Sequence, residues 1–579
     1  MANTVEEECC TGLSRGLRRQ ARSFWEAAFE FRNHKEIDFA YSKCDPHPFP
    51  HPESDRLEHC YKYGKGSGKF FPVLLEQKLG DYVVKAKLGH GNFASVWQCI
   101  LDEGKERDFP YESVAVKVCT NSKKESKDDV TEAKVLMKLS KRSDGKGDFG
   151  KKHLQKVDEC FRVPGYFGDH FCIVGEAIGP SLDYYLNLVE KQGLGSFDTQ
   201  VSKKITFQLL ASVTWLHKAG YGHGDIHPHN ILMKEKGFKA GTNAKRPICI
   251  QNTKPEDVPY MPPYLVSCID DDLTIRTPLT VQNCDARLAD FGQTFKKNQP
   301  RRLYKMTTPK GNRSPEWLLK HTPITIGIDI WAIACISYRM TTGKHLMFVE
   351  ERYKDEEGKY TQKRTKVDIN NDHMPMMVKL LGAPPAWMVR KWGVSGLPKM
   401  DWESIPHGGN LHERIMKDRP ASMSDAEAAL FEDFMRKALT WDYRYRATAA
   451  ELIQHDWFRS VLSPKDKAHL ETLAQSTSRF SSTVSRITNE IKSWPARWLS
   501  PWTKKEELAS QQATEIKALG PILGPFFQAE IMGNTPEVLG GSWSFQYQGR
   551  QLIKLVRIFN IHTAYQILMV STETSLPPT

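Results

Sequence analysis

Nowhere in its 579 residues does the chain contain 18 uninterrupted apolar residues, the length that a membrane-spanning helix needs. The nearest candidate, Ile324 to Met340, carries Asp329 and Arg339, so we expect a buried helix there and no membrane association. A second stretch, Leu552 to Val570, is also interrupted by charges and indicates a core or partner contact. The 12 cysteines lack the paired spacing of a metal site, and no secretory signal precedes the adjacent pair Cys9-Cys10. These absences favour reduced thiols in the cytoplasm, the nucleus or both.

The composition is that of a globular protein, with 40% hydrophobic and 26% charged residues. Its formal net charge of +12 has two interpretations. One is attraction to an anionic partner such as a nucleotide, nucleic acid or acidic lipid, and the other is a solvated surface with a surplus of lysine. We predict no direct binding of nucleic acid. The length suits a two-lobed domain with extensions.

The octapeptide His223-Gly-Asp-Ile-His-Pro-His-Asn230 places a carboxylate, Asp225, five residues before an amide, Asn230, in a polar loop. Phosphoryl transfer needs a carboxylate to hold the acceptor hydroxyl and oxygen ligands to hold a metal ion, and H-x-D-x-x-x-x-N supplies one of each. Asp225 would orient and deprotonate the hydroxyl, and Asn230 would help to hold Mg²⁺. Taken alone, such a loop is more often an ordinary turn.

Further elements accompany this loop in the order that nucleotide chemistry requires. A turn containing Gly89 and Gly91 between two strand-like segments would let backbone amides approach phosphate oxygens. Lys117 would supply a cation for the α- and β-phosphates, and an ion pair with Glu132 would fix that cation. Asp290, in Asp-Phe-Gly, would be a second metal-binding carboxylate. Each feature alone is common, since solvent-facing charges and glycine hairpins abound. Five such elements in the required order very rarely arise by chance.

Local patterns predict a small half that is mostly sheet, followed by a mostly helical half. The interval Lys234–Asn283 is rich in Lys, Pro and Asn, and its length indicates an insertion. A polar run at Ser476–Ser485 indicates a linker. Strands are expected at Tyr82–Leu88, within Gly89–Trp97, and at Ser113–Val118, Val163–Tyr166 and Phe171–Val174. Helices are expected at Asp128–Leu139, Val201–Lys218, Ile328–Thr341, Met374–Leu381, Asp425–Ala438 and Ala447–His455.

Together these elements resemble a eukaryotic protein kinase, with a small lobe from about 82 to 175 and a large lobe to about 458. Arg313-Ser-Pro-Glu316 is similar to the end of the activation segment in the CMGC group, which contains the cyclin-dependent, mitogen-activated and SR-protein kinases. Asp329-Ile-Trp331 resembles the start of the long central helix, and Arg446 is placed like the arginine that pairs with the Glu316-type glutamate. SR-protein kinases of the fungal type are the most similar, through Lys87–Trp97, Asn371–Pro385, Glu451–Trp457 and the insertion before Asp-Phe-Gly.

The resemblance implies an α+β, bilobal protein-kinase fold, with a small β-rich N-lobe that has one main helix and a larger, mainly helical C-lobe. It implies a monomeric serine/threonine protein kinase that uses ATP and Mg²⁺ and phosphorylates serines in Arg/Ser-rich protein substrates. The expected domains are a partly disordered N-terminal extension at 1–55, a lead-in at 56–81, the N-lobe and hinge at 82–178, the C-lobe at 179–458 with an insertion at about 234–283, and a C-terminal extension of unknown role at 459–579.

The same likeness assigns the site residues. The catalytic residues are Asp225, Lys117 and His227, and the metal ligands are Asn230 and Asp290. The expected nucleotide-binding residues are Leu88, Gly89, His90, Gly91, Asn92, Val96, Ala115, Lys117, Glu132, Glu176 and Ile178.

Four positions depart from the usual kinase pattern. Ala94 replaces the third glycine of the turn, which is a mild change. Gly224 stands where many kinases carry an arginine that awaits a phosphorylated activation loop, which favours constitutive activity. His227 replaces a lysine that touches the transferred phosphate, and a neutral imidazole would lower turnover. Gly175 occupies the gatekeeper position before the hinge Glu176-Ala-Ile178 and would leave an open pocket behind the adenine.

Two other functions stay open. A pseudokinase that binds nucleotide or protein partners without turnover is supported by His227. A small-molecule phosphotransferase of the aminoglycoside or choline kinase type has a similar loop, but such enzymes generally lack the Ser-Pro-Glu segment and the Arg446-type partner. A basic substrate needs an acidic docking surface, for which Glu350–Glu357 is a candidate, although a solvated loop is the more ordinary interpretation.

Overall fold

The computed structural model describes most of residues 69–473 and five strands outside that range. The predicted linker Ser476–Ser485, most of the acidic stretch Glu350–Glu357, and the extension 1–55 apart from 40–43 lie outside the described residues. The described residues are 40–43, 69–106, 112–121, 127–142, 149–165, 168–235, 247–251, 262, 264–266, 268, 278–297, 310–319, 322–348, 352–354, 360–363, 366–394, 409–473, 527–531, 542–547, 550–557 and 567–571.

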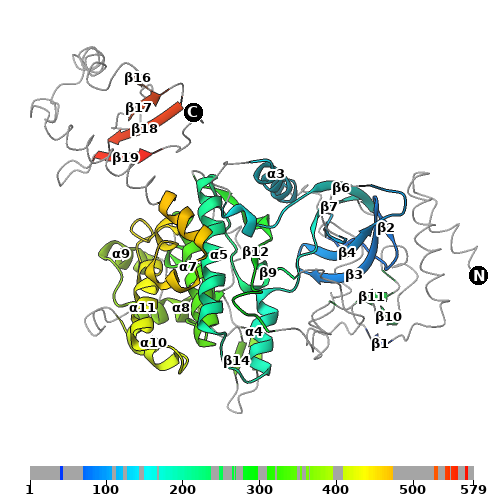
Figure 1. The fold of residues 1–579 in the computed structure, drawn as a ribbon, viewed down its shortest axis with the longest axis horizontal. Coiled ribbons are helices and arrows are strands. Elements are labelled where there is room, and N and C mark those ends of the chain that lie inside the picture. The colour runs from blue at the N-terminus through cyan, green and yellow to red at the C-terminus, as the bar shows by residue number, and fades with distance from the viewer. Residues whose placement is uncertain are drawn as a thin grey trace, which may run out of the picture. The chain divides into compact units, whose positions relative to one another are not determined.

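The small lobe is built on a six-stranded sheet with the order β2-β3-β4-β5-β7-β6, in which every neighbouring pair is antiparallel (Figure 1). All the strands predicted in this region are present, most with longer bounds. Alternating burial along β3 shows why the segment forms a strand, since Tyr82, Val84 and Ala86 are buried on alternate positions. The strands are β2 (Lys78–Leu79), β3 (Tyr82–His90), β4 (Ala94–Leu101), β5 (Val114–Cys119), β6 (Glu159–Gly165) and β7 (Gly168–Glu176).

The main helix of the small lobe, α3 (Lys127–Lys141), is the helix predicted at Asp128–Leu139. It buries Val135, Leu136 and Leu139 in the same apolar core as the large lobe. The α3 helix is therefore packed against both lobes, and Glu132 in its first half is buried beside Lys117.

One face of the small-lobe sheet packs against two segments that lie outside the sheet. Phe71 and Leu74 come from the lead-in before β2, and Val266 comes from the insertion in the large lobe. Val266 is 1% exposed and belongs to β11 (Tyr264–Val266). This strand pairs with β10 (Pro247–Gln251), which pairs in parallel with β1 (Ala40–Lys43) from the N-terminal extension. Strand β11 of the insertion thus contributes Val266 to the small-lobe core.

The large lobe is mainly helical, as predicted. Its helices are α4 (Leu182–Lys191), α5 (Thr199–Lys218), α6 (Pro315–Leu318), α7 (Gly327–Thr342), α8 (Lys366–Leu381), α9 (Ala386–Val394), α10 (Leu411–Asp418), α11 (Asp425–Ala438) and α12 (Ala449–Leu452). Its strand pairs are β8 (Tyr221–Gly222) with β13 (Phe295–Lys296), β9 (Ile231–Met233) with β12 (Ala286–Leu288), and β14 (Arg352–Lys354) with β15 (Tyr360–Lys363).

One predicted helix is much shorter than expected. The pattern at Ala447–His455 gives only α12, which begins with a capping box between Thr448 and Glu451. The chain then turns, because the His455 ring accepts a hydrogen bond from the backbone N–H of Trp457 and caps a following 3₁₀ turn. Helix α12 therefore ends before His455, because the side chain of His455 caps the 3₁₀ turn that follows.

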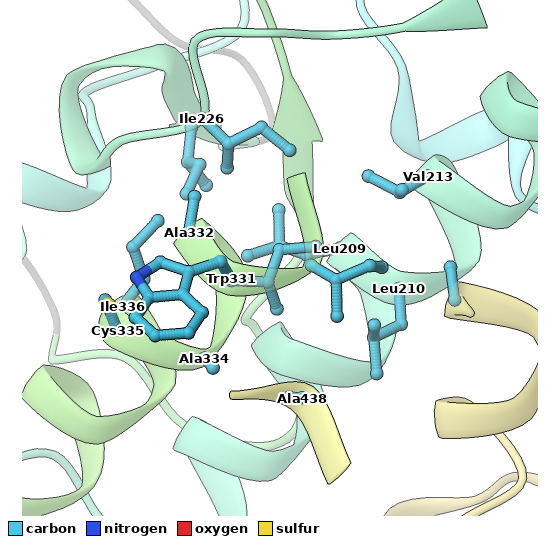
Figure 2. Close-up of a cluster of buried hydrophobic side chains, with 14 of the residues drawn as sticks. Leu209, Leu210, Val213, Ile226, Trp331, Ala332, Ala334, Cys335, Ile336 and Ala438 are labelled. Atoms are coloured by element: carbon cyan, nitrogen blue, oxygen red, sulfur yellow. The ribbon is translucent and has the colours of Figure 1, made fainter. Parts of the chain in front are cut away.

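Helices α5 and α7 contribute to one buried cluster in the large-lobe core, in which Figure 2 labels Leu209 and Val213 of α5 and Trp331 of α7. Trp331 is fully buried, and 14 of the 16 residues of α7 are buried, which confirms the buried helix predicted there. None of the helices among the described residues is both long and apolar enough to cross a membrane.

A second compact unit spans Thr477–Thr579. Its described part is a four-stranded antiparallel sheet, in the order β16 (Phe527–Ile531), β17 (Ser542–Tyr547), β18 (Arg550–Arg557) and β19 (Ile567–Ser571). The apolar stretch Leu552 to Val570 contributes to two strands that pair with each other.

Candidate active site

The centre of the site is the ammonium of Lys117 on β5. Its Nζ lies 3.0 and 3.1 Å from the two carboxylate oxygens of Glu132 on α3, so the predicted ion pair is present. The same Nζ lies 2.9 Å from Oδ1 of Asp290. Although burial opposes it, the two carboxylates hold the pKa of Lys117 well above its ordinary value. In turn, Lys117 keeps the pKa of Asp290 well below that of an ordinary carboxyl. Lys117 and Asp290 are therefore both charged at neutral pH.

The Asp-Phe-Gly segment is held in one conformation by its flanks. Asp290 has a φ of 61°, a left-handed conformation that non-glycine residues rarely adopt. Phe291 is 1% exposed, and its ring meets the ring of His223 edge-on at 5.0 Å. The backbone N–H of Gly292 donates to Asp290 Oδ1 at 3.3 Å. The buried phenylalanine thus anchors the strained aspartate so that it faces Lys117.

The loop 223–230 is tied down by a buried carboxylate on α7. Asp329 accepts hydrogen bonds from the backbone N–H groups of His223, at 2.8 Å, and Gly224, at 2.9 Å. It also lies 2.9 Å from Nε2 of His217. Burial raises the pKa of Asp329, but these hydrogen bonds outweigh it and leave the pKa below the ordinary value.

Sequence reasoning assigned Asp329 only to the start of a helix and missed this anchoring. A signal was present, because a carboxylate in an otherwise apolar, buried helix must have hydrogen-bond partners.

Asp225 and Asn230 contact each other within this loop. The Asn230 side-chain amide donates to the Asp225 backbone carbonyl at 2.9 Å. The backbone carbonyl of Asn230 accepts from Ala289 N at 2.8 Å, next to Asp290. Among the described residues, Oδ1 of Asp225 is buried without a hydrogen-bond partner, and a buried acceptor of this kind calls for a ligand. Contacts thus link the four predicted groups at 117, 225, 230 and 290.

His227 lies beside the predicted base. Its Nε2 is 3.7 Å from Oδ2 of Asp225, and its ring meets that of His229 edge-on at 5.7 Å. His229 Nε2 is 3.6 Å from Oδ2 of Asp183, which also pairs with Arg339 at 3.3 Å. The imidazole of His227 is therefore next to the carboxylate that the sequence assigns to the acceptor hydroxyl.

Most of the predicted nucleotide-binding residues belong to the strands and the hinge near Lys117. Leu88 and Val96, on either side of the glycine turn, pack with Ala115 and with Ala177 of the hinge. This apolar patch has the chemistry that an adenine ring needs. At the two ends of the hinge, Glu176 pairs with Lys234 at 2.6 Å, and the carbonyl of Ile178 accepts from Glu235 N at 3.0 Å.

The two glycines of the turn have open space where a side chain would begin. A Cβ atom added at Gly89 or Gly91 would meet nothing within 4 Å, and the turn is closed by a 2.8 Å hydrogen bond from Gly91 N to Ala94 O. The neighbouring His90 is half-buried, and Asn92 at the tip is exposed. The two glycines therefore leave room for a ligand to approach the turn from outside the sheet, as expected for a phosphate-binding turn.

The expected open pocket at Gly175 is wrong. A Cβ atom at this position would lie 2.4 Å from the backbone carbonyl oxygen of Lys156. The space that a gatekeeper side chain would take is filled by the chain leading into β6. Glycine is required here because the two backbones are in close contact.

A buried ion pair lies beneath the end of the activation segment. Both side chains of Arg446 and Glu316 are completely buried, and their two contacts are 2.6 and 2.9 Å long. The guanidinium also lies 5.1 Å from the Trp331 ring. The resemblance predicted this pair from residues 130 positions apart, and the structure confirms it.

Comparison with known proteins agrees with this geometry. The family model described as protein kinase domain matches residues 82–245 and 272–458, more than half of the chain, and the gap in the match lies inside the predicted insertion. Serine/threonine-protein kinase AFC3 of Arabidopsis thaliana is 26% identical over 396 residues, which cover 66% of this chain and 82% of that protein.

Two further relatives are similar at the same level. Serine/threonine-protein kinase SRPK of Physarum polycephalum is 24% identical over 429 residues, covering 68% of this chain and 90% of that protein. Human dual specificity tyrosine-phosphorylation-regulated kinase 4 is 22% identical over 421 residues, covering 72% of this chain, and this chain spans 64% of its length.

Proposed function

The chain belongs to the protein kinase domain family as a serine/threonine kinase with relatives in the CMGC group, and we propose that it transfers the ATP γ-phosphate to serines of Arg/Ser-rich proteins. The observation that carries this proposal is the pairing of Lys117 with both Glu132 and Asp290. That pairing joins a strand, a helix and the Asp-Phe-Gly segment around one cation, which is the arrangement that phosphoryl transfer by kinases requires.

Each polar group then has one task. Lys117 neutralises the non-transferred phosphates, while Asp225 accepts the proton of the serine hydroxyl through its unpartnered oxygen. Asn230 and Asp290 supply oxygen ligands of the type that Mg²⁺ prefers, and Mg²⁺ usually takes only one or two carboxylates plus phosphate oxygens. When bound, the ion would neutralise charge on the β- and γ-phosphates.

The substrate class rests on resemblance. The residues at Lys87–Trp97 and Asn371–Pro385 are similar to SR-protein kinases, and one relative is named serine/threonine-protein kinase SRPK. Serines flanked by arginines are the acceptors expected of a kinase that resembles SR-protein kinases. Action as a monomer, in the cytoplasm, the nucleus or both, stays a prediction.

A pseudokinase is the second candidate, and His227 is the observation that favours it. An imidazole 3.7 Å from Asp225 carries less positive charge than the usual lysine. Small-molecule phosphotransferases are less well supported, because the buried pair between Arg446 and Glu316 belongs to an activation segment of the protein-kinase type.

An acceptor panel tests these proposals. The purified chain is incubated with Mg²⁺ and labelled ATP and with an Arg/Ser repeat peptide, a matched Lys/Ser repeat peptide or kanamycin, with Asp225→Ala as the inactive control. We expect label on the Arg/Ser peptide at several times the rate of the Lys/Ser peptide. Equal rates on the two peptides would remove the substrate assignment, and label on kanamycin alone would remove the protein-kinase assignment. Binding of ATP without transfer to any acceptor would favour the pseudokinase.

A further inference from the structure

The position of Glu132 depends on how α3 is held, and the end of this helix is held by a neighbouring loop. Lys151 donates to the backbone carbonyl of Ser140 at 3.0 Å and to that of Arg142. A lysine at this place satisfies terminal carbonyls and complements the negative end of the helix dipole. The same ammonium lies 5.8 Å from the ring of Trp215 on α5. The α3 helix is thus capped by a side chain that also contacts the large lobe.

The loop that carries Lys151 has little freedom. A Cβ atom at Gly150 would lie 1.9 Å from the carbonyl oxygen of Ala211 on α5, so the backbones are in direct contact. The ring of His153 lies 3.1 Å from the carbonyl oxygen of Ala286, and Gln155 N donates to Leu288 O at 2.8 Å. The segment 149–155 therefore belongs mechanically to the large lobe while it caps a helix of the small lobe.

Phe149, at the start of this segment, is held by a ring from outside the kinase match. The imidazole of His469 stacks on it with centroids 4.4 Å apart and an interplanar angle of 18°. Phe207 of α5 meets the same ring edge-on at 5.8 Å, and Lys152 lies 5.1 Å above it. Stacked pairs of this kind stabilise by more than their buried area alone.

His469 is presented by a well-defined helix at 464–473, beyond the last residue of the family match at 458. Ser463 begins this helix, because its hydroxyl accepts from Asp466 N at 3.2 Å while the Asp466 carboxylate accepts from Ser463 N at 3.0 Å. Leu470 and Leu473 pack against the large-lobe core. The helix is thus anchored independently of the Phe149 contact, which lets it act as a fixed support for that ring.

We propose that His469 is a positioning residue for phosphoryl transfer, which acts by stacking on Phe149, fixing the loop that caps α3, and so holding Glu132 against Lys117. This inference rests on the proposed kinase activity. It gives a task to the first part of the C-terminal extension, to which the sequence assigned none.

Three single variants of the full chain test it. His469→Ala should lower kcat about two- to tenfold, the range expected from loss of one stacked pair. His469→Phe keeps an aromatic ring and should restore kcat, and Glu471→Ala, an exposed position on the same helix, should leave it unchanged. The KM for the peptide should not change. Wild-type kcat in folded His469→Ala would overturn the proposal. If that variant does not fold, Phe149→Leu removes the same stack and decides by the same criterion.

The route through α3 has its own test. In a Glu132→Gln background, His469→Ala should have no further effect on kcat, and an undiminished loss there would refute the route. Hydrogen exchange in residues 127–141 should be faster in His469→Ala than in wild type and normal in His469→Phe. Unchanged exchange would overturn the inference. Because exchange needs no phosphoryl transfer, this measurement still decides the matter if the chain proves inactive and the proposed function fails.

Discussion

His227 is a departure from the usual kinase pattern that lies in the site itself. It lies 3.7 Å from Asp225, where other kinases place a lysine against the transferred phosphate. Positive charge aimed at the transition state is among the largest contributions to catalysis. The predicted consequence is an active enzyme that turns over slowly.

Replacing His227 by lysine should therefore raise kcat, by about tenfold or more, because one fully charged donor is added next to the reacting group. The measurement is steady-state kinetics on the Arg/Ser peptide. His412→Lys on the exposed face of α10 makes the same chemical change elsewhere and serves as the control. A lower kcat in His227→Lys would show that the imidazole has a task of its own.

A second histidine, His373 on α8, should make stability depend on pH. It is completely buried, and neither ring nitrogen has a hydrogen-bond partner within the part of the chain that the structure describes. Burial, aided by the nearby Arg313, lowers the pKa of His373 to about 3. The unfolded chain, with a pKa near 6.5, binds the proton more readily. Stability from this group is therefore present above pH 6.5 and is lost as the pH falls toward 3.

Urea unfolding at pH 7.5 and 5.5 checks this pH dependence. Wild type should lose about 1 kcal/mol more stability between these values than His373→Leu, which has no group to protonate. If the two proteins lose equal stability, the buried neutral histidine is not the cause.

The pair between Arg446 and Glu316 gives a third prediction at this scale. Arg446→Ala should destabilise the large lobe by about 3–5 kcal/mol, because it leaves a completely buried carboxylate without its partner. The free energy of unfolding from urea titration measures this. The double variant Arg446→Met with Glu316→Leu removes both charges and should recover much of the loss. A small effect of the single variant would mean that water reaches Glu316.

At the scale of elements, the sequence predicted most of what is present, because its signals are local. Strand alternation at 82–88 and helical spacing at 201–218 depend only on neighbouring residues, and both are borne out. The order of the motifs then predicted the pairing of Lys117 with Glu132. Placement of the insertion could not be predicted, since Val266 joins a core whose other members lie some 90 residues or more away in sequence.

Gly175 is a second case in which the sequence could not predict a contact between distant segments. The glycine shows that no side chain is present at 175, but the space is filled by the carbonyl of Lys156, which belongs to another segment. The anchoring by Asp329 also depended on a distant loop. What the sequence could not provide was contact between remote segments.

The insertion can be tested as an element of the small lobe. Val266→Asp should lower the melting temperature by about 5 °C or more, because it places a charge in a core position that is 1% exposed. Gln282→Asp introduces the same group at an exposed position near the end of the insertion and should leave the melting temperature unchanged. Equal melting temperatures for the two variants would show that Val266 of the insertion is not part of the small-lobe core.

At the scale of the whole molecule, the two lobes meet in a site whose charged groups are already paired. Lys117, Glu132 and Asp290 are in contact, and the loop at 223–230 is held by Asp329. Gly224, with a φ of 86°, replaces the arginine that would otherwise await a phosphate on the activation segment. We therefore predict that assembly of the site does not depend on that modification.

Phosphatase treatment of the purified protein should accordingly leave its kcat within about twofold of the untreated value, since no arginine at 224 must be neutralised. Intact mass before and after treatment verifies the removal of phosphate. A loss of tenfold or more on dephosphorylation would show that another cation has taken over the role.

The central claim is that Asp225 acts on the acceptor at a site where Lys117, Asn230 and Asp290 hold Mg²⁺ and ATP. The most direct test is single-turnover transfer of the γ-phosphate to an Arg/Ser peptide by wild type and Asp225→Asn, with the affinity for Mg²⁺ and ATP measured alongside. We predict that transfer falls by about 10²-fold or more while nucleotide affinity stays within about twofold. Equal transfer rates in the two proteins would contradict the account.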